Sequence, residues 1–286
     1  MRVILLKDGD PFANLAAERL LFEEGSAEES LLLYVNKPCV VIGRSQNPFA
    51  EADLRALRQY GMPLVRRYTG GGTVYHDPGN LNYTFIQNRH GYDKFENSGR
   101  ILKALADLGI AAEVTERNDL VIGKRKFSGS AYRLTKEKAL HHGTLLVSSD
   151  LSLLHSALKP SFRRIEGKGV LSVRSPVICL NDIIPGLTVE LVIDALVRHF
   201  NHGVWEEVPP DGELYIRSRT QAENFSAWEW VFGRTPHFSF ELFIEDRNMR
   251  VDVVNGRITK SSPPGIGELF GKKVDQLWNH EGLSVD

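Results

Sequence analysis

Three consecutive glycines at positions 70–72 constrain the fold of this chain more than any other feature of its sequence. Without side chains, the backbone there can adopt positive φ, and its N–H groups can approach a ligand closely. An apolar run at residues 62–65 precedes the glycines, and an alternating pattern resumes at Val74. The sequence therefore predicts a turn between two strands. A flexible hairpin tip is one interpretation of such a triplet.

Charged and polar side chains on both sides of the glycines favour an anion site over a plain hairpin tip. Arg66 and Arg67 precede the glycines, and His76, Asp77 and Asn80 follow them. The segment lacks the Gly-Lys-Ser/Thr ending of a Walker A loop, and no helix-forming run follows it as in the GxGxxG motif of a dinucleotide fold. We therefore expect the segment to bind an anionic ligand of another kind.

A second polar cluster extends over residues 117–146. Residues 120–122 and 126–132 are predicted to form two short strands that meet at Gly123, which places Lys126 on a hairpin. Only small side chains occupy residues 128–131, and such a run suggests that a ligand or another backbone lies against it. A tightly packed strand crossing is the other interpretation.

These two clusters belong to a longer series of motifs. Residues 66–82 read Arg-Arg-x-x-Gly-Gly-Gly-x-Val-x-His-Asp-x-Gly-Asn-x-Asn, and Asn-Asp-Leu-Val-Ile, Lys-x-Ser-Gly-Ser-Ala-Tyr-Arg and His-His-Gly-Thr-Leu-Leu follow in that order. Further motifs are Val-Ile-Gly-Arg-Ser-Gln-Asn-Pro at 41–48, Lys-Gly-Val-Leu-Ser-Val-Arg-Ser at 168–175 and Trp-Glu-Trp-Val-Phe-Gly-Arg-Thr-Pro-His-Phe-Ser at 228–239. With these motifs the chain resembles the lipoate-protein ligase A family, part of the biotin/lipoate protein ligase superfamily.

The resemblance implies a ligase that works in two steps. The carboxylate of lipoate or octanoate attacks the α-phosphate of ATP to form lipoyl-AMP, and a lysine of a lipoyl carrier domain then takes the acyl group. ATP and Mg²⁺ are the implied cofactors, and the carriers are 2-oxoacid dehydrogenase E2 subunits, the glycine cleavage H protein or similar proteins. Because a carboxylate and a triphosphate repel each other, such a site requires cationic side chains and backbone donors.

Lys126 is the residue that we expect to act in catalysis. Its compact ammonium could contact the acyl carbonyl and the α-phosphate together, whereas a lone lysine is otherwise a solvated surface charge. Asp119 would hold Mg²⁺ against the phosphates, with capping of the hairpin turn as its alternative role. Asn118 would contact the nucleotide.

The other residues expected to bind lipoate and the adenylate come from the same motifs. The glycine-rich segment would exclude water from the reactive mixed anhydride. Residues 168–175 would be a mobile loop that closes over the adenylate and brings positive charge with it. The complete set of expected binding residues is Arg66, Arg67, Gly70, Gly71, Gly72, Thr73, Val74, Tyr75, His76, Asn80, Asn118, Asp119, Ser128, Gly129, Ser130, Ala131, Arg133, His142, Gly143, Thr144, Lys168, Ser172 and Arg174.

Three histidines invite a metal interpretation, which the pattern does not favour. His141 and His142 are adjacent, and adjacent residues on a strand point to opposite faces, so both cannot easily join one site. We expect His76 to bind the ligand or brace the glycine-rich segment, and one of the adjacent pair to be a core residue.

Charge and cysteine content restrict the class of protein. A formal net charge of −1 over 286 residues gives no general attraction to nucleic acid or membranes, so we expect neither as a partner. Two cysteines are too few for a disulfide framework, and the chain does not open with a cationic, apolar leader. The cytoplasm is the expected location, or an organelle if a transit peptide has been removed.

Helical and strand patterns are interleaved along the first part of the chain, which predicts the α+β class with a mixed β-sheet domain flanked by helices. One predicted helix is capped by Asp10, and a second starts at Asn47 and Pro48 and ends by Gly61. Two more are predicted at about residues 92–108 and 188–200. We expect residues 1–235 to form the catalytic domain.

Residues 236–286 are expected to form a small C-terminal α/β domain. Alternation over residues 238–244 predicts a strand, Asn255 and Gly256 predict a hairpin turn, and a final helix is predicted near residues 266–278. Full ligases of the family carry a longer C-terminal domain, so the sequence leaves two alternatives open. One is a lipoyl or octanoyl transferase that uses preformed lipoyl-AMP or an acylated carrier, and the other is a non-catalytic, adenylate-binding regulatory protein.

A transferase that proceeds through a thioester needs a cysteine at the site. Cys39 and Cys179 both lie outside the positions where the motif chemistry converges. Biotin ligases share the general architecture, but their Gly-Arg-Gly-Arg signature is absent from this sequence.

Overall fold

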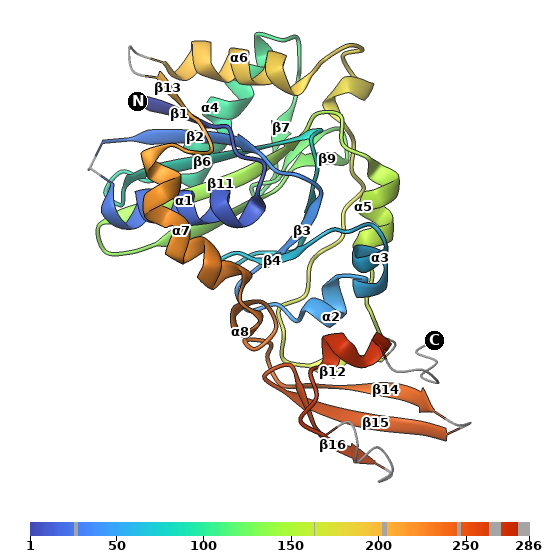
Figure 1. Ribbon diagram of the computed structural model, residues 1–286. Helices are drawn as coiled ribbons and strands as arrows, with labels where there is room; N and C mark the ends of the chain where they lie inside the picture. Colours follow the sequence, from blue (N-terminus) through green and yellow to red (C-terminus); the bar gives the residue numbers. More distant parts are fainter. Residues whose placement is uncertain (26–27, 163, 202–204, 245–246, 263–269, 280–286) are drawn as a thin grey trace. The chain divides into compact units, whose positions relative to one another are not determined.

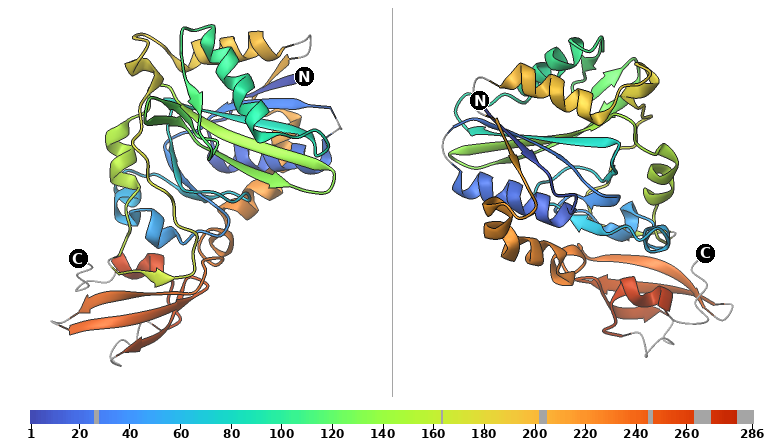
Figure 2. Two further views of the ribbon diagram at one scale, coloured as in Figure 1. Left: turned by 180° about the vertical axis from the view of Figure 1, so that it is seen from behind. Right: turned by 45° about the horizontal axis from the view of Figure 1, so that its top comes forward.

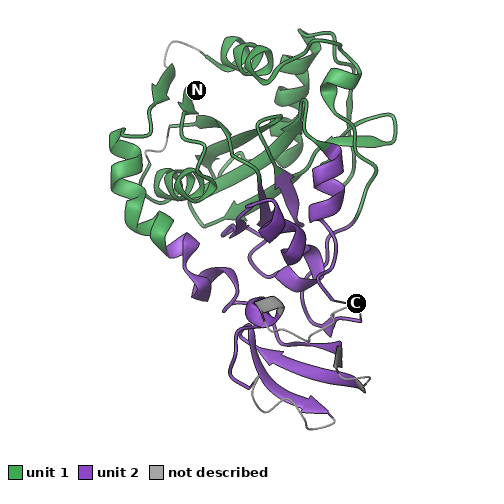
Figure 3. Cartoon of the chain, turned by 45° about the vertical axis from the view of Figure 1, so that its right-hand side comes forward, with its two compact units in different colours: residues 1–38, 76–150, 174–223 green, residues 39–75, 151–173, 224–286 purple. Residues whose placement is uncertain are grey.

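The chain folds into two compact units, each assembled from three segments of the sequence. The computed structural model describes residues 1–286 except 26–27, 163, 202–204, 245–246, 263–269 and 280–286. Unit 1 comprises residues 1–38, 76–150 and 174–223, and unit 2 comprises residues 39–75, 151–173 and 224–286 (Figure 3). The expected division into domains at residues 235 and 236 stays a prediction.

Unit 1 is built on a six-stranded mixed sheet with the strand order β10-β11-β6-β2-β1-β13. β1 pairs in parallel with β2 and β13, whereas β6 pairs antiparallel with β2 and β11. The strands are β1 (Arg2–Leu6), β2 (Ser30–Val35), β6 (Asn80–Asn88), β10 (Ser130–Leu134), β11 (Lys138–Leu146) and β13 (Trp205–Val208).

Helices cover both faces of this sheet (Figures 1 and 2). α4 (Lys94–Ala106) and α6 (Val189–Phe200) lie on one face, and α1 (Pro11–Glu24) lies on the other. α7 (Glu213–Ser226) lies beside α1, where the Tyr215 hydroxyl donates to Asn14 Oδ1 at 2.5 Å. A 3₁₀ helix (Leu180–Asp182) precedes α6. This layered arrangement, together with the sheets of unit 2, confirms the predicted α+β class.

β6 lies in the middle of the sheet and has two chemically different faces. Leu81, Tyr83 and Phe85 belong to the apolar core of unit 1, which α4 and α6 also line. Three of the alternate residues of β6, Asn80, Asn82 and Thr84, are polar and also buried, and Ile86 follows them in the same alternation. Because successive side chains of a strand point to opposite faces, the α1 face of this strand carries a buried polar layer.

A small three-stranded sheet of unit 1 carries the Lys126 hairpin. It consists of β7 (Glu113–Val114), β8 (Leu120–Ile122) and β9 (Arg125–Ser128) in that order. The single strand predicted over residues 126–132 is wrong, because the chain passes at Gly129 from β9 into β10 of the larger sheet. An alternating pattern alone does not show where a chain changes sheets.

Local signals set the ends of the helices. Asp10 caps α1 by accepting from the Phe12 N–H at 2.9 Å, as predicted. The predicted helix from Pro48 to near Gly61 is wrong as one element, because it forms α2 (Pro48–Glu51) and α3 (Leu54–Gln59). Asp53 caps α3 by accepting from two backbone N–H groups, while the preceding Ala52 is extended at φ −128°. A strong capping residue in the middle of the run therefore started a new helix.

Unit 2 contains two further sheets, with strand orders β4-β3-β5 and β12-β14-β15-β16. Its strands are β3 (Cys39–Ile42), β4 (Leu64–Arg66), β5 (Val74–His76, which ends at the boundary with unit 1), β12 (Glu166–Gly167), β14 (Phe238–Ile244), β15 (Arg247–Val254) and β16 (Arg257–Ser262). Its other helices are α5 (Leu151–Ala157) and α8 (Trp228–Val231).

In the C-terminal sheet of unit 2, the strand predicted over residues 238–244 forms as β14, and the predicted hairpin turn also forms. Asn255 and Gly256 join β15 to β16 and have φ values of 51° and 70°, which confirms the predicted hairpin turn. Part of the helix predicted near residues 266–278 lies outside the described residues, and residues Val274–Asn279 form a 3₁₀ helix.

Phe49, Phe162 and Phe238 are among the aromatic rings that pack together in this unit. No described helix in either unit is long and apolar enough to cross a membrane.

Candidate active site

The glycine-rich segment of unit 2 connects β4 to β5, as the sequence predicted. β3 lies between these two strands in the sheet, so the chain has to cross one end of β3. Gly71 adopts φ 87°, in the region that favours glycine over any residue with a side chain. The triplet is therefore a sharply turned crossing that needs glycine at position 71.

Arg66 is fully buried at the end of β4, and its guanidinium binds backbone carbonyls of its own unit. Burial and then the positive charge of Arg234 lower the pKa of Arg66 to about 10. Five carbonyl oxygens accept hydrogen bonds from this one side chain, those of Gly43, Arg44, Gln46, Trp230 and Val231. These contacts tie the residues after β3 to α8.

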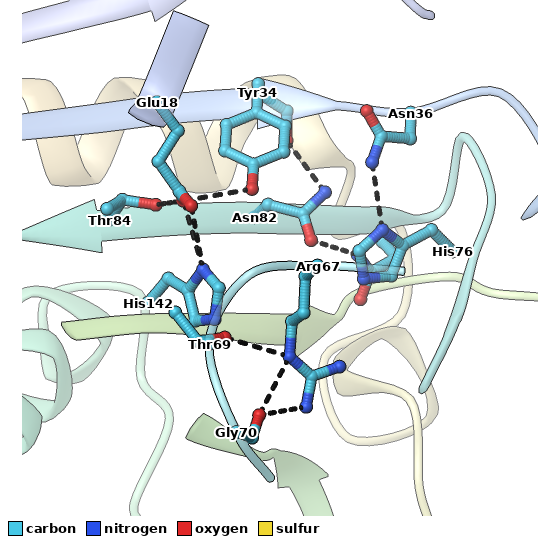
Figure 4. Close-up of polar contacts among 11 residues, drawn as sticks. Glu18, Tyr34, Asn36, Arg67, Thr69, Gly70, His76, Asn82, Thr84 and His142 are labelled. Atoms are coloured by element: carbon cyan, nitrogen blue, oxygen red, sulfur yellow. Dashed lines mark hydrogen bonds and ion pairs between the residues drawn. The ribbon is translucent and has the colours of Figure 1, made fainter. Parts of the chain in front are cut away.

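Arg67 is also buried and shapes the glycine-rich segment directly (Figure 4). Its guanidinium donates to the carbonyl oxygens of Gly70 at 2.7 Å and Gly72 at 2.6 Å. It also donates to Thr69 Oγ1 and to the Val41 carbonyl. Because the guanidinium of Arg67 binds the carbonyl oxygens of the glycine-rich segment, it helps to fix the backbone conformation of that segment.

Lys126 and Asp119 form an ion pair within unit 1. The Nζ of Lys126 lies 2.7 Å from Oδ1 of Asp119, and their side chains are 26% and 15% exposed. Gly129 makes room for this lysine, because a Cβ there would lie 2.7 Å from Nζ. The backbone of Lys126 is held at both ends, since its N–H donates to Pro176 O and its carbonyl accepts from Ile178 N–H. The hairpin thus presents a partly exposed ammonium on a residue whose backbone N–H and carbonyl are both hydrogen-bonded.

Asn118 precedes this pair in a left-handed conformation, with φ 64°. Its Nδ2 donates to Ser130 Oγ at 3.2 Å and to the Tyr132 hydroxyl at 2.5 Å. Its Oδ1 is buried and has no hydrogen-bond partner among the described residues. The side chain of Asn118 therefore has one buried acceptor without a partner among the described residues, in the residue before Asp119.

A buried carboxylate that the sequence analysis missed lies on the α1 face of the unit 1 sheet (Figure 4). Glu18 is 0% exposed and accepts from Thr84 Oγ1 at 2.6 Å and Tyr34 OH at 3.4 Å. His142 Nδ1 lies 3.0 Å from the same carboxylate. The available signal was that Glu18 lies at helical spacing, four residues after Asn14, among the apolar residues Leu15, Ala16 and Leu20 of α1.

The two adjacent histidines of β11 have opposite surroundings, as the strand pattern predicted. His142 pairs with Thr84 in the sheet register and faces Glu18, whereas His141 pairs with Phe85. The His141 ring lies 4.7 Å from that of Tyr132, and burial together with the nearby His142 and Lys94 lowers its pKa to about 3. His141 is therefore a neutral core residue.

His76 belongs to the polar layer of unit 1 rather than standing alone. Its Nδ1 lies 2.9 Å from Asn36 Nδ2 (Figure 4). Asn82, on the same face of β6 as Asn80, donates to the Tyr34 carbonyl at 3.2 Å. These contacts brace the chain where β5 leads into β6.

The structure divides the expected site residues between the two units. Within unit 1 the Thr144 N–H donates to the Gly129 carbonyl, and the Gly129 N–H donates to Thr144 Oγ1. The sheet register also pairs Ser130 with Gly143 and Ala131 with His142. Unit 1 holds His76, Asn80, Asn118, Asp119, Lys126, Ser128, Gly129, Ser130, Ala131, Arg133, His142, Gly143, Thr144 and Arg174. Unit 2 holds Arg66, Arg67, Gly70, Gly71, Gly72, Thr73, Val74, Tyr75, Lys168 and Ser172.

Comparisons with known proteins find similarity over most of the chain. The model of the lipoyl protein ligase A/B catalytic domain matches residues 10–201. The structure is similar to that of P. falciparum LipL1 in complex with lipoate, with 26% identity, a TM-score of 0.71 and coverage of 91% of this chain and 83% of that one. It is also similar to lipoate-protein ligase A bound with ATP, with 26% identity, a TM-score of 0.67 and coverage of 80% and 97%.

A third similar structure comes from an archaeal lipoylation system, that of the bipartite lipoate protein ligase and its E2 lipoyl domain from Thermoplasma acidophilum. It is 27% identical, with a TM-score of 0.67 and coverage of 80% of this chain and 95% of that one. The matched model spans most of the chain, which therefore belongs to the lipoyl protein ligase A/B catalytic domain family of enzymes.

Proposed function

We propose that this protein is a lipoate-protein ligase, which activates lipoate or octanoate with ATP and transfers the acyl group to a lysine of a lipoyl carrier domain. The similar structures support each component, because they include a ligase with lipoate, a ligase with ATP, and a ligase studied with its E2 lipoyl domain. The carrier would accordingly be an E2 subunit or a related lipoyl protein.

The observation that carries this proposal is the environment of Lys126. Its ammonium is positioned by Asp119, a carboxylate 2.7 Å away, yet about a quarter of the side chain stays exposed. An ammonium with three donors can keep one partner and still bind two ligand oxygens. Lys126 therefore suits a reaction in which negative charge develops on two neighbouring groups.

The first proposed step joins the acyl group to AMP. A carboxylate oxygen of lipoate attacks the α-phosphorus of ATP, a new P–O bond forms, and pyrophosphate leaves. Lys126 would hold the carboxylate and the α-phosphate within reach of each other, and its charge would stabilise the phosphate oxygens in the transition state.

The second proposed step transfers the acyl group. The carrier's lysine, as a neutral amine, attacks the carbonyl carbon of lipoyl-AMP, an amide bond forms, and AMP leaves with the electrons of the broken C–O bond. The amine gives up a proton to solvent. Lys126 would now stabilise the carbonyl oxygen, where the charge grows.

The donor set beside Lys126 fits a magnesium ion bound together with ATP. Mg²⁺ prefers one or two carboxylates completed by phosphate oxygens and water. Asp119 supplies a carboxylate, and the unpartnered Asn118 Oδ1 supplies a neutral oxygen nearby in sequence. When bound, the ion would neutralise part of the triphosphate charge. Asp119 would meanwhile keep Lys126 in place.

The glycine-rich segment of unit 2 is itself suited to binding an anionic group. Arg67 binds the carbonyls of Gly70 and Gly72, so the segment's backbone is held in one conformation before a ligand arrives. A pre-arranged backbone donor binds an anionic group without a further cost for ordering the loop.

Thioester chemistry is not favoured by the cysteines. Cys179 is buried, and its Sγ lies 3.4 Å from the Ser149 carbonyl. Burial, with smaller contributions from Asp182 and Asp77, raises the pKa of Cys179 to about 11, so little reactive thiolate forms. Cys39 is fully buried on β3. An acyl-adenylate therefore suits this chain better than an acyl-cysteine.

The experiment that tests the proposal is incubation with ATP, Mg²⁺, lipoate and a purified E2 lipoyl domain. We expect pyrophosphate release, and intact mass should show the carrier heavier by one lipoyl group. A parallel reaction supplies preformed lipoyl-AMP without ATP. Transfer in the second reaction without pyrophosphate in the first would show a lipoyltransferase, and failure of both would overturn the proposed function.

A further inference from the structure

Ser172 is the centre of a hydrogen-bond network in unit 2 that the proposed reaction does not explain. Its hydroxyl donates to Glu51 Oε2, and it accepts from the Thr73 N–H at 2.8 Å and from Gln46 Nε2 at 3.1 Å. A serine hydroxyl can donate once and accept twice. Ser172 therefore uses its complete hydrogen-bonding capacity within the protein.

Glu51 holds Ser172 at two points. While one carboxylate oxygen accepts from the Ser172 hydroxyl, the other accepts from the Ser172 backbone N–H at 3.0 Å. The residue is only 8% exposed. Hydrogen bonds to a carboxylate are roughly twice as strong as those between neutral groups. The two hydrogen bonds to Glu51, at the end of α2, therefore hold Ser172 strongly in place.

Gln46 connects Ser172 to two other parts of unit 2. Its Oε1 accepts from the Gly43 N–H at 2.8 Å and from Thr73 Oγ1 at 2.9 Å, while its Nε2 donates to Ser172 Oγ and to the Val170 carbonyl at 3.3 Å. The side chain is 0% exposed. One buried amide thus links the end of β3, the glycine-rich segment and the segment at residues 168–173.

The glycine-rich segment lacks side chains of its own over residues 70–72, so its conformation depends on side chains from elsewhere. Arg67 holds its carbonyls from one side. Ser172 holds the first backbone N–H after the triplet, that of Thr73. Gly72 permits this approach, because a Cβ at this position would lie 3.0 Å from Ser172 Oγ.

Apolar burial contributes little to holding the segment around Ser172. Its neighbours Val170, Leu171 and Val173 are 53%, 68% and 61% exposed. The polar contacts of Ser172, with those of the Val170 backbone, therefore dominate its attachment. A segment held by a few polar contacts can detach at low cost when these contacts are removed.

We propose that Ser172, which is hydrogen-bonded to Glu51 and Gln46, is a positioning residue that couples residues 168–173 to the glycine-rich segment. This coupling retains the acyl-adenylate in the active site until the acyl group is transferred. Only the retention of the acyl-adenylate rests on the proposed function. The coupling itself is a property of unit 2 and can be measured without any reaction.

The first measurement is hydrogen exchange of the ligand-free protein. In Ser172→Ala we expect the amide hydrogens of peptides covering residues 70–75 and 168–173 to exchange about tenfold faster than in the wild type, since a hydrogen-bond grip of this kind is lost. Ser172→Thr keeps the hydroxyl and should restore slow exchange. Leu171→Ala, in the same segment but outside the network, is the matched control and should leave exchange unchanged. Unchanged exchange in Ser172→Ala overturns the coupling.

The second measurement is the partition of lipoyl-AMP between transfer and escape. With limiting carrier, we expect Ser172→Ala to raise the ratio of AMP released to carrier modified by about tenfold, and Glu51→Gln, which keeps one acceptor oxygen, to raise it less. Faster exchange with an unchanged ratio overturns the retention role. If the wild type neither forms nor uses lipoyl-AMP, the proposed function fails, while the exchange result still decides the coupling.

Discussion

Arg66 in unit 2 and Lys126 in unit 1 are both cationic residues at the edge of a glycine-containing motif, yet the structure uses them differently. Arg66 is 0% exposed and donates to five backbone carbonyls. Lys126 keeps about a quarter of its side chain exposed, and within the described part of the chain it forms an ion pair with the carboxylate of Asp119. One cation is part of the scaffold, and the other keeps its ammonium partly exposed.

This difference shows that the role of a cationic residue in a motif depends on how many of its N–H donors are already hydrogen-bonded within the protein. A guanidinium has five N–H donors, and Arg66 has directed its donors to the protein. The ammonium of Lys126 has three, and it is partly exposed beside Asp119. The comparison predicts that removing Arg66 costs stability, whereas removing Lys126 costs rate.

The largest expected effect is that of Lys126→Ala on transfer from supplied lipoyl-AMP. Loss of a donor at a developing oxyanion costs about 10² to 10³ in rate, or roughly 3 to 4 kcal/mol. Thermal unfolding should change little. Lys126→Arg should rescue only in part, because the planar guanidinium is wider than the ammonium. Lys124→Ala, an exposed lysine of the same hairpin, is the control. Retention of more than about a tenth of the rate in Lys126→Ala would place the catalytic centre elsewhere.

Next in size is the effect of Arg66→Met on folding. This substitution leaves several buried carbonyl oxygens without the guanidinium that donates to them. We therefore expect the free energy of unfolding, measured with urea, to fall by about 3 kcal/mol. Arg44→Met removes an exposed arginine of the neighbouring loop and should stay within about 0.5 kcal/mol of the wild type. If the two variants were equally stable, the assignment of Arg66 to the scaffold would be wrong.

A smaller effect is expected for Gly71→Val in the segment that Arg67 holds. A side chain at φ 87° strains the backbone by about 1 to 2 kcal/mol. We expect the fold to survive and lipoate to bind about tenfold more weakly in calorimetry. Gly70→Ala is the matched control, because its Cβ would meet nothing within 4 Å. Equal affinity in both variants would show that the segment is only a turn.

The smallest effect concerns His141, which extends the comparison from arginine and lysine to histidine. Its pKa is about 3 in the folded protein and about 6.5 when unfolded. The unfolded state therefore binds the extra proton first, and stability is complete above pH 6.5 and falls as the pH decreases toward 3. Between pH 7.5 and 5.5 the wild type should lose about 1 kcal/mol more than His141→Phe. Identical pH profiles would contradict a buried, neutral His141.

Local signals were sufficient for the elements that the sequence predicted well. Asp10 capped α1, Thr188 capped α6, and Asn255 with Gly256 formed the hairpin turn. Each of these depends on side chains and backbone within a few residues. Asp53 shows the limit, because its capping of α3 was hidden within a run that looked like one helix.

Long-range contacts account for what the sequence did not show. The carbonyls bound by Arg66 come partly from residues more than 160 positions away, and no pattern near Arg66 reports them. Glu18 looks like an ordinary helix residue until Thr84 and His142 are placed opposite it. The motifs gave a set of expected site residues, whereas the three-dimensional structure was required to show which of their side chains the protein itself binds.

The two-sided burial of β6 has a consequence for how the chain folds. Because its side-chain period is two, a slip of one residue against β2 or β11 would exchange every position between the faces. Asn82 and Thr84 would enter the layer of Tyr83 and Phe85, and Glu18 would lose a hydroxyl partner while facing aromatic rings. Mispaired chains would therefore bury polar atoms without partners. The polar layer thus acts as a check on strand registry during folding, independently of any ligand.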